Sequence, residues 1–517
     1  GIQDYTIVGP ILQSIGDETA DMQGGRMSCV SQQACGGSVV RITCEPGAHV
    51  IGAWAYAVRD GKASGETHIE LSDAVRDGQL EWVAPAGDWL VVLVFARLNA
   101  FDPMHPNAGC LAIDRLYVPF ERECPGEVGR TLDLFFQDEL DFGARMPFWS
   151  NCLFSSFAKL KGYDVAHWLP ALWHDLGPLT EKIRLDYADV VTRRIEDCYF
   201  KPVFHWHESR GTLLGHDNGG RGGVAEGRAH YGDYFRAMRW FSAPGCDDPR
   251  IQGARAFRGL KVNSSIAHLF GRQRVWLEAF HSSGWGTNPA EIITALHENF
   301  VYGANLVNPH GLYYSTHGGW WEWAPPDVHF RQPYWRHAGS SQLYLTRMSW
   351  LLSQGVHQCD VAILYPTDAI DAQAEDPSFH HTTAHTGNGV VSEGDPNDPQ
   401  PEETAFALGK FLFDHACDFD FIDSDSLASG ETGDGELKAG ETRARYRVLV
   451  IPAMSALRHG ALEMALKYAL AGGLVIAFVR LPLITDPKAT ALTRIPFGAR
   501  ASAIDRVIWS IAAAPIE

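Results

Sequence analysis

Short apolar runs alternate with amphipathic stretches from Gly126 to about Gly355, and this alternation constrains the fold more than any other feature of the chain. TLDLFFQDEL and TLLGHD have the length and composition of strands, whereas FSSFAKLKGYDVAHWLPALW and LDYADVVTRRIEDCYFKPVFHWHESRG have those of helices. RVWLEAF, PAEIITALHENFVYG and ANLVNPHG continue the pattern, which predicts parallel βα units. About 230 residues of such units suit a (β/α)8 (TIM) barrel, and we place this barrel at 126–357.

The segments on either side of the predicted barrel have different patterns of apolar and turn-forming residues. Up to about Pro125, β-prone runs such as SVVRITCE, HVIGAWAYAV and WLVVLVFARL are separated by Gly, Pro and Asp. This pattern indicates an N-terminal β-sandwich at 1–125, with an irregular α+β extension as the alternative. Beyond CDVAILYP, strand and helix patterns indicate an open α/β domain at 358–517, with a long exposed loop at 371–403. No GxGxxG or P-loop follows the strands of this domain, so we expect a structural or interface role and no organic cofactor.

The formal net charge of −19 limits the partners of the chain. Such a surface repels phosphate backbones, and no basic stripe offsets it, so we expect no nucleic-acid partner. No apolar run reaches the length of a membrane span, so we expect no membrane insertion. The 16 Trp residues provide flat apolar faces that suit the rings of a carbohydrate as well as protein cores. A neutral or small substrate therefore fits the composition better than a polyanion.

The cysteines and the first residues bear on the compartment. The ten Cys residues are scattered without a CxxC pair, so their spacing indicates neither a zinc site nor a compact disulfide framework. The chain begins GIQDYT, without a basic-then-apolar leader, and we expect that any signal peptide has been removed or was never included. The compartment and the oligomeric state stay open, with a secreted or periplasmic location favoured over a cytoplasmic one.

Acidic residues stand at the ends of three predicted strands. Asp138 and Glu139 end TLDLFFQDEL, Asp217 ends TLLGHD, and Glu278 lies near the end of RVWLEAF. In a barrel, the residues at the carboxyl ends of the strands form the active site whatever the reaction is. A single acid in this place is often a salt-bridge partner, but two glutamates at strand ends, with Trp and His following, favour catalysis.

Glycoside hydrolysis requires two carboxyl groups, one protonated to assist the leaving oxygen and one ionised to activate water or attack carbon. We predict that Glu278 and Glu139 are this pair. The apolar neighbours Val275, Leu277 and Phe280 would raise the pKa of Glu278 by desolvation, as a general acid requires. The assignment of acid and base between the two glutamates stays open.

Further residues near these acids are candidates for contacts with a sugar. His281 follows the key strand directly, and it is either a contact to a sugar hydroxyl or a structural residue. Trp285, and Trp320 and Trp321 in HGGWWEWAPP, favour stacking on a sugar face over burial in a core. Asp217 opens the loop DNGGRGG, which could cradle a phosphate, let the backbone pass close to a sugar, or be a plain turn.

The order and spacing of several motifs resemble those of glycoside hydrolase family 106, the α-L-rhamnosidases, over roughly 126–366. The motifs are QDEL with PFWS, KGYD, HWHESRG, GHD, PGCDDP, RVWLEAFHSSGWG, NPHGLYYS and LLSQGVHQCDVAILYP. The resemblance implies a barrel with accessory β domains, an inverting mechanism with two glutamates, and Ca²⁺ in or near the sugar site. It places these acids on Glu278 and Glu139, makes Asp138 a candidate for orienting substrate or ion, and leaves the metal ligands open. The C-terminal region also resembles the amidotransferase-like domain of family 42 β-galactosidases.

The favoured function is removal of a terminal α-L-rhamnose or a related sugar by inversion, as in polysaccharide degradation. A retaining family 42-like glycosidase and a non-catalytic carbohydrate-binding barrel are the alternatives. An inverting pair should stand roughly 6.5–9.5 Å apart and a retaining pair about 5–5.5 Å, and the resemblance favours the longer distance. If Glu139 is not the partner of Glu278, Asp217 or Glu208 is the next candidate.

Overall fold

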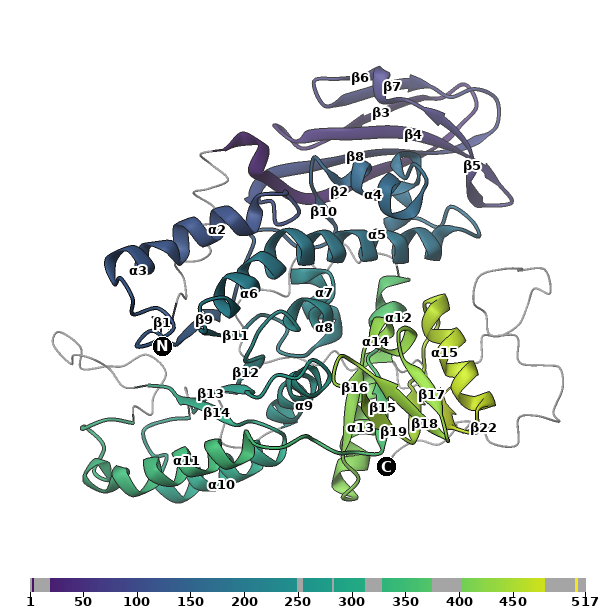
Figure 1. Cartoon of the computed structure of the whole chain (residues 1–517). Coiled ribbons are helices and arrows are strands. Elements are labelled where there is room, and N and C mark those ends of the chain that lie inside the picture. Colours follow the sequence, from purple (N-terminus) through teal and green to yellow (C-terminus); the bar gives the residue numbers. More distant parts are fainter. Residues whose placement is uncertain are drawn as a thin grey trace.

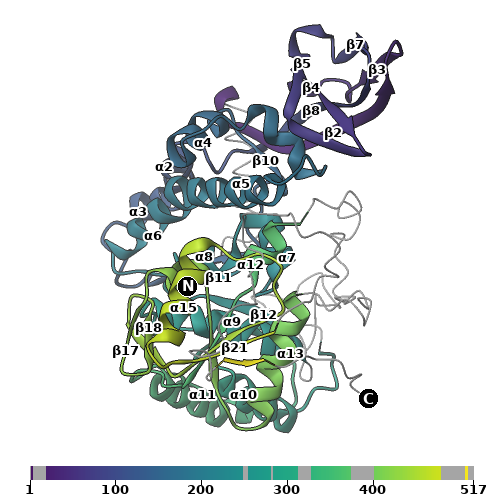
Figure 2. The ribbon, with the colours of Figure 1, turned by 90° about the vertical axis from the view of Figure 1, so that its right-hand side faces the viewer.

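The computed structural model describes residues 2–3, 19–248, 254–280, 283–311, 328–373, 401–478 and 507–509. Figure 1 shows a β-rich N-terminal part at one end, a central row of strands with helices, and a C-terminal α/β part beside that row. The view turned by 90° in Figure 2 shows the same separation of the β-rich part from the rest. The chain is therefore multidomain, with β and α/β parts.

Two antiparallel sheets form the β-rich part. The larger sheet has the strand order β10-β2-β8-β4-β5, and the smaller has the order β3-β7-β6. The strands are β2 (Gln23–Cys35), β3 (Val39–Thr43), β4 (His49–Arg59), β5 (Lys62–Glu70), β6 (Val75–Arg76), β7 (Gln79–Val83), β8 (Asp88–Phe101) and β10 (Phe148–Trp149).

Strand β8 is buried on both faces along its middle. Val91 and Leu93 belong to the apolar cluster that fills the space between the two sheets. Val92 and Val94, on the opposite face, belong to the main core, together with Trp168 from the short helix η3 (Ala166–Leu172). This double burial accounts for the unbroken apolar run in β8 and attaches the sandwich to the helices below it.

Helices connect the sandwich to the central strands and then cover those strands. Their bounds are α2 (Ala108–Leu116), α3 (Val118–Glu123), α4 (Leu153–Lys161), α5 (Thr180–Ile195), the π-helical η4 (Glu196–Phe200) and α6 (Lys201–Glu208). The last three follow one another without a break, which confirms the long helix that the sequence predicts before Gly211. The short 3-10 helices η1 (Ala20–Met22) and η2 (Ser72–Ala74) lie at turns near the sandwich.

The central strands form two parallel sheets of three strands each, with the orders β1-β9-β11 and β12-β13-β14. An isolated parallel bridge between Gly215 and Ala243 lies between them. The strands are β1 (Ile2–Gln3), β9 (Leu134–Asp138), β11 (Leu213–Asp217), β12 (Gly245–Asp248), β13 (Trp276–Ala279) and β14 (Leu306–Pro309).

The predicted closure into a barrel of eight strands within 126–357 is not confirmed. The described part of the chain supplies six strands to the two central sheets, and one of these, β1, comes from the start of the chain and pairs with β9. The helices between and after the strands are α7 (Val224–Tyr231), α8 (Tyr234–Met238), α9 (Ala254–Leu269), α10 (Pro289–Val301), η5 (Trp335–His337) and α11 (Ala338–Leu352). The βα alternation expected from the sequence is thus present without the full barrel.

The C-terminal part contains a five-stranded parallel sheet of order β16-β15-β20-β21-β22 and a small antiparallel sheet of order β17-β18-β19. The strands are β15 (Val361–Leu364), β16 (Phe419–Ile422), β17 (Glu431–Gly433), β18 (Glu436–Ala439), β19 (Ala444–Tyr446), β20 (Val448–Ile451), β21 (Leu474–Ala477) and β22 (Val507–Trp509). The helices are α12 (Thr367–Asp371), α13 (Pro401–Asp414), α14 (Ser424–Ala428) and α15 (His459–Leu470). Most of the predicted loop at 371–403 lies outside the described residues.

None of the helices in the described ranges combines the length and the apolar character that crossing a bilayer requires.

Candidate active site

The alternation of side chains along the central strands separates an inner face from an outer face. Phe136 on β9 and Trp276 on β13 stack with their ring centroids 4.3 Å apart and form a small apolar cluster. Phe135 and Leu277, the next residues of the same strands, belong instead to the main core beneath the helices. Because side chains two residues apart share a face, Asp138 and Glu278 lie on the inner face with the apolar cluster.

Strand register then brings the acids of neighbouring strands side by side. Asp138 at the end of β9 is directly opposite Asp217 at the end of β11. Glu278 on β13 is directly opposite Asp247 on β12, and on its other side it is opposite Asn308 on β14. Carboxylate oxygens of Asp138, Asp217 and Glu278 all lie within 4.8 Å of one another. Three strand ends that are far apart in the sequence therefore meet in one acidic group.

The proton affinity of this acidic group is raised by burial and by mutual repulsion. Glu278 is 6% exposed, and burial, together with the charges of Asp217, Asp247 and Asp138, raises its pKa to about 9. Burial also raises the pKa of Asp217 to about 6, although the guanidinium of Arg221 opposes this shift. Glu278 is therefore protonated at neutral pH. Its Oε2 atom is buried and has no hydrogen-bond partner among the described residues.

Arg221 supplies the positive charge at the centre of the site. Its Nε donates to Oδ1 of Asp217 at 3.0 Å, and its Nη2 donates to Oε1 of Glu139 at 2.7 Å. The same Nη2 lies 3.3 Å from Oδ2 of Asp247. One guanidinium thus connects acids from the ends of β9, β11 and β12, and it joins Glu139 to the group that contains Glu278.

A glycine-rich loop after β11 presents Arg221. Gly220 has φ +91°, and an added Cβ would lie 2.6 Å from the backbone nitrogen of Gly227. No larger residue fits there without moving the loop. Arg221 itself has φ +40°, and two other non-glycine residues of the site, Glu139 and Phe280, have φ +46° and +77°. Such conformations cost free energy and gather at functional sites, which agrees with the position of the acidic group.

The C-terminal part of the chain contacts the segment that follows Arg221. Glu402 of α13 accepts hydrogen bonds from the backbone nitrogens of Val224 and Ala225, each at 3.0 Å, at the start of α7. The hydroxyl of Tyr365, which follows β15, donates to the carbonyl oxygen of Gly222 at 3.1 Å. A residue from a distant part of the sequence therefore caps the helix next to the arginine loop.

Comparison with known families identifies the chain. Residues 56–376 match the family model of glycoside hydrolase family 106, described as alpha-L-rhamnosidase, and this match covers more than half of the chain. The chain belongs to glycoside hydrolase family 106. The match begins within the β-rich part and extends past β15, so it includes every strand-end acid described above.

A solved rhamnosidase structure resembles this family 106 chain in fold. The rhamnosidase from Novosphingobium sp. PP1Y superposes with a TM-score of 0.58 and 19% identity, covering 81% of this chain and 40% of that protein. The family 106 chain therefore spans about two fifths of the length of that relative. A GH42 β-galactosidase from G. stearothermophilus gives a TM-score of 0.45 at 12% identity, covering 67% and 51% of the two chains. An exo-carrageenase GH42 from Bacteroides ovatus gives 0.48 at 11%, covering 74% and 53%. No curated protein sequence matches.

The residues of the acidic group fit a hard divalent cation, which the family 106 resemblance implies. Asp138, Asp217 and Glu278 each offer an oxygen within 4.8 Å of the other two. Ca²⁺ takes oxygen ligands at about 2.3–2.6 Å, so oxygens on opposite sides of one ion are separated by up to about 5 Å. The donors here are all carboxylates, and the buried Oε2 of Glu278 is an acceptor without a described partner.

Several sequence-predicted residues of the family 106 chain do not enter this group or lie outside the described part. His281, Trp320 and Trp321 lie outside the described residues. Trp285 lies in the turn after β13 and is 48% exposed. Glu208 ends α6, before the start of β11, and its carboxylate pairs with His205 at 3.2 Å. Glu208 therefore precedes the strand, at the edge opposite the one that carries Asp217.

Two residues of the site, Arg221 and Asp247, were not singled out by sequence reasoning. Asp247 lies in PGCDDP, and the period of two along a strand places it on the same face as Gly245. This motif contributed only to the family resemblance. Arg221 lies in DNGGRGG, where the glycines suggested a turn or a phosphate cradle. The contacts of Arg221 with Glu139 and Asp247 join residues from separate strand ends, and no local pattern predicts them.

Proposed function

We propose that the chain hydrolyses a terminal α-L-rhamnoside, or the glycoside of a closely related sugar, with inversion at the anomeric carbon. The feature that carries this proposal is the buried carboxyl group of Glu278 on β13, whose pKa is raised and which lies within 4.8 Å of the carboxylates of Asp138 and Asp217. Two carboxyl groups in different protonation states are what glycoside hydrolysis needs. Membership of family 106 supports the choice of sugar.

Glu278 is the proposed general acid. Bond cleavage at the anomeric carbon leaves negative charge on the departing oxygen, and a proton delivered to that oxygen stabilises the transition state. The pKa of about 9 keeps this proton on Glu278 throughout the neutral range. Its Oε2 atom, which is buried and has no hydrogen-bond partner among the described residues, is the proposed donor of this proton.

Glu139 is the proposed general base. Its carboxylate accepts a charge-assisted hydrogen bond from Arg221, and its side chain is 36% exposed, so water reaches it. In the inverting reaction the base takes a proton from water while that water attacks the face of the sugar opposite the leaving group. Arg221 orients this carboxylate, and Asp217 in turn holds Arg221.

A Ca²⁺ ion held by Asp138 and Asp217, with Glu278 at the edge of the site, is part of the proposal. Such an ion, when bound, would bind sugar hydroxyl oxygens and offset the repulsion among the acids. A carboxylate that binds the ion has already lost its proton, so the proposal keeps Glu278 as the proton donor and Asp138 and Asp217 as the ligands of the ion. Trp285, and the predicted contacts His281, Trp320 and Trp321, are proposed to contact the sugar.

The test measures turnover of nitrophenyl α-L-rhamnoside, β-galactoside and other nitrophenyl glycosides by the wild type and by Glu278→Gln. We expect turnover of the rhamnoside and a fall in kcat of at least about 100-fold in the variant, with sugar binding retained, because the amide keeps the shape but delivers no proton. Glu208→Gln, at the opposite edge of the sheet, is the matched control and should keep full activity. NMR of the first-formed sugar should show the anomer opposite to that of the substrate.

Three outcomes contradict the proposal. Turnover of the galactoside in place of the rhamnoside would favour a family 42-like activity, and binding of sugars without turnover would favour a carbohydrate-binding barrel. Retention of configuration would exclude the inverting pair Glu278 and Glu139.

A further inference from the structure

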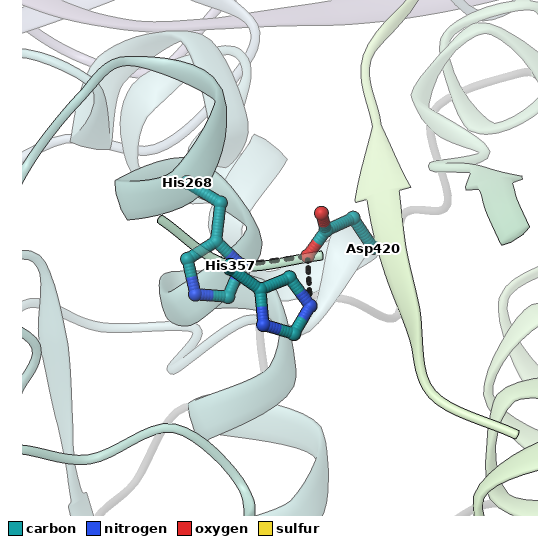
Figure 3. A group of neighbouring side chains, drawn as sticks. All are labelled: His268, His357 and Asp420. Carbon is teal, nitrogen blue, oxygen red and sulfur yellow. Dashed lines mark hydrogen bonds and ion pairs between the residues drawn. The ribbon is translucent and has the colours of Figure 1, made fainter. Parts of the chain in front are cut away.

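A second cluster of potential metal ligands lies away from the candidate active site, where the central part meets the C-terminal sheet. His268 comes from the last turn of α9, His357 from the segment between α11 and β15, and Asp420 from β16. Figure 3 shows the two imidazoles converging on the carboxylate of Asp420. One nitrogen of each histidine and one carboxylate oxygen all lie within 4.8 Å of one another.

The carboxylate of Asp420 is held in one orientation by its surroundings. Asp420 is 1% exposed, and its Oδ2 accepts hydrogen bonds from the hydroxyl of Tyr446 at 3.0 Å and from Sγ of Cys359 at 3.5 Å. Its Oδ1 faces the histidines, at 2.8 Å from Nδ1 of His268 and 3.8 Å from Nε2 of His357. The outer contacts thus fix the carboxylate and turn Oδ1 toward the two histidines, where it hydrogen-bonds to Nδ1 of His268.

His357 has an unused nitrogen in this cluster. Its Nε2 is buried and has no hydrogen-bond partner among the described residues, although Oδ2 of Asp418 lies 3.6 Å away and Oδ1 of Asp420 lies 3.8 Å away. Both distances are too long for a hydrogen bond. Zn²⁺ binds nitrogen and oxygen at about 2.0–2.2 Å in a tetrahedron, which separates its ligand atoms by roughly 3.3–3.6 Å. The gap beside His357 therefore has the size that one such ion occupies.

The charges of the cluster also suit a divalent cation. Asp418 and Asp420 are both acids, and the nearby buried Lys261 is engaged with Oδ1 of Asp418 at 2.6 Å. With neutral imidazoles the group carries one uncompensated negative charge.

We propose that His268, His357 and Asp420 bind a Zn²⁺-class transition-metal ion that joins α9 to the C-terminal sheet. Imidazole nitrogens with one carboxylate favour such an ion over Ca²⁺ or Mg²⁺, which prefer oxygen alone. Asp418 is the neighbouring carboxylate that adds negative charge, and water or Asp418 completes the coordination. The site is structural, because it connects three segments that come from two parts of the molecule.

One rearrangement accompanies binding. The rings of His268 and His357 stack with centroids 3.9 Å apart and an angle of 9° between their planes. A metal ion lies close to the plane of each imidazole that binds it, so the two rings must tilt away from this stack. His357 turns without losing a described hydrogen bond of its Nε2. The 2.8 Å hydrogen bond between Nδ1 of His268 and Oδ1 of Asp420 must open to admit the ion.

The experiment titrates ZnCl₂ into the chelator-treated full chain by calorimetry, with Ca²⁺ present in excess to occupy oxygen-only sites. We expect one saturable site and a higher Tm with Zn²⁺, and we expect Co²⁺ in its place to give the visible absorption of tetrahedral coordination. His357→Ala should weaken this binding on the order of 100-fold or more, whereas His205→Ala, which removes an exposed histidine, should leave it unchanged.

Glu278→Gln separates this site from the candidate active site and should bind Zn²⁺ as the wild type does. The proposal is overturned if the wild type shows no saturable site, if His357→Ala binds as tightly as the wild type, or if Glu278→Gln also loses the binding. None of these measurements uses a sugar, so they are independent of the proposed hydrolase activity.

Discussion

Glu278 binds a proton in the folded chain, and this proton lowers the negative charge of the acidic group at the strand ends. Its strand places it among Asp138, Asp217 and Asp247, and the resulting repulsion and burial keep its proton bound. For a carboxyl group whose folded pKa is raised, the folded state holds a proton that the unfolded state has already lost. The free energy of unfolding therefore falls as pH rises from about 4.5, the unfolded value, to about 9.

This linkage predicts a difference between the wild type and Glu278→Gln. From pH 6.5 to 8.5 the wild type should lose up to about 1.4 kcal/mol of unfolding free energy per pH unit more than the variant, because the amide has no proton to bind. Asp217, whose pKa is raised to about 6, contributes mainly below this window. Urea unfolding at several pH values measures both slopes. Equal slopes would mean that Glu278 is ionised in the folded chain.

The strand-end acids could be predicted at the scale of residues because a local rule places them. Glu278, Asp138 and Asp217 follow from apolar runs that end in acids, and the structure brings these three together. Arg221 could not be predicted in this way, because only Asp217 is near it in sequence, whereas Glu139 and Asp247 come from the ends of other strands.

At the scale of elements, segments with a clear hydrophobic period could be predicted as helices or strands. The sequence did not predict which strands pair with one another. The helices α5, α6, α13 and α15 and the strands β11, β16 and β21 lie where the sequence indicated them. The two-residue strand β1 has no period to detect, and its pairing with β9 is a contact across more than 130 residues. Closure into eight strands depends on such pairings, and for this reason composition and spacing alone could not settle it.

The loop between β11 and α7 gives a prediction at this scale. Gly220→Ala should lower kcat/KM for the substrate at least about tenfold, or 1.4 kcal/mol, because its Cβ would meet the backbone of Gly227 and displace Arg221. Gly211→Ala is the matched control: Gly211 also has positive φ, at +69°, but an added Cβ there meets nothing within 4 Å. Both variants should lose about 1–2 kcal/mol of stability from the strained backbone. Equal kcat/KM in the two would show that the loop does not position Arg221.

At the scale of the whole molecule, described residues of the C-terminal part support the loop of the candidate active site from outside the acidic group. Glu402 caps α7, Tyr365 contacts Gly222, and Arg228 of α7 donates to Asp371 at 2.7 Å. These contacts all lie next to the loop that carries Arg221. The domain boundaries expected at 125 and 357 stay predictions. The contacts of Glu402, Tyr365 and Asp371 with the loop and α7 cross the boundary expected at 357.

Glu402→Ala tests the contact between α13 and the start of α7. Removing the carboxylate leaves two part-buried backbone N–H groups without their acceptor, which should cost about 1–3 kcal/mol of unfolding free energy and lower kcat through the arginine loop. Glu403→Ala, the adjacent acid with a half-exposed ion pair to Arg258, should change both quantities little. Thermal unfolding and steady-state kinetics of the two variants give the comparison. If Glu402→Ala keeps the wild-type Tm and kcat, the cap has no part in supporting the site.

The cap on α7 also restricts how this architecture can be recombined. A hybrid with the central strands of this chain and the C-terminal sheet of another glycosidase would keep every acid at the strand ends. It would keep the acceptor for Val224 and Ala225 only if the new C-terminal part carried an acid in the place of Glu402. The acidic residue at position 402 is accordingly the one to match first when C-terminal parts are exchanged between family 106 enzymes.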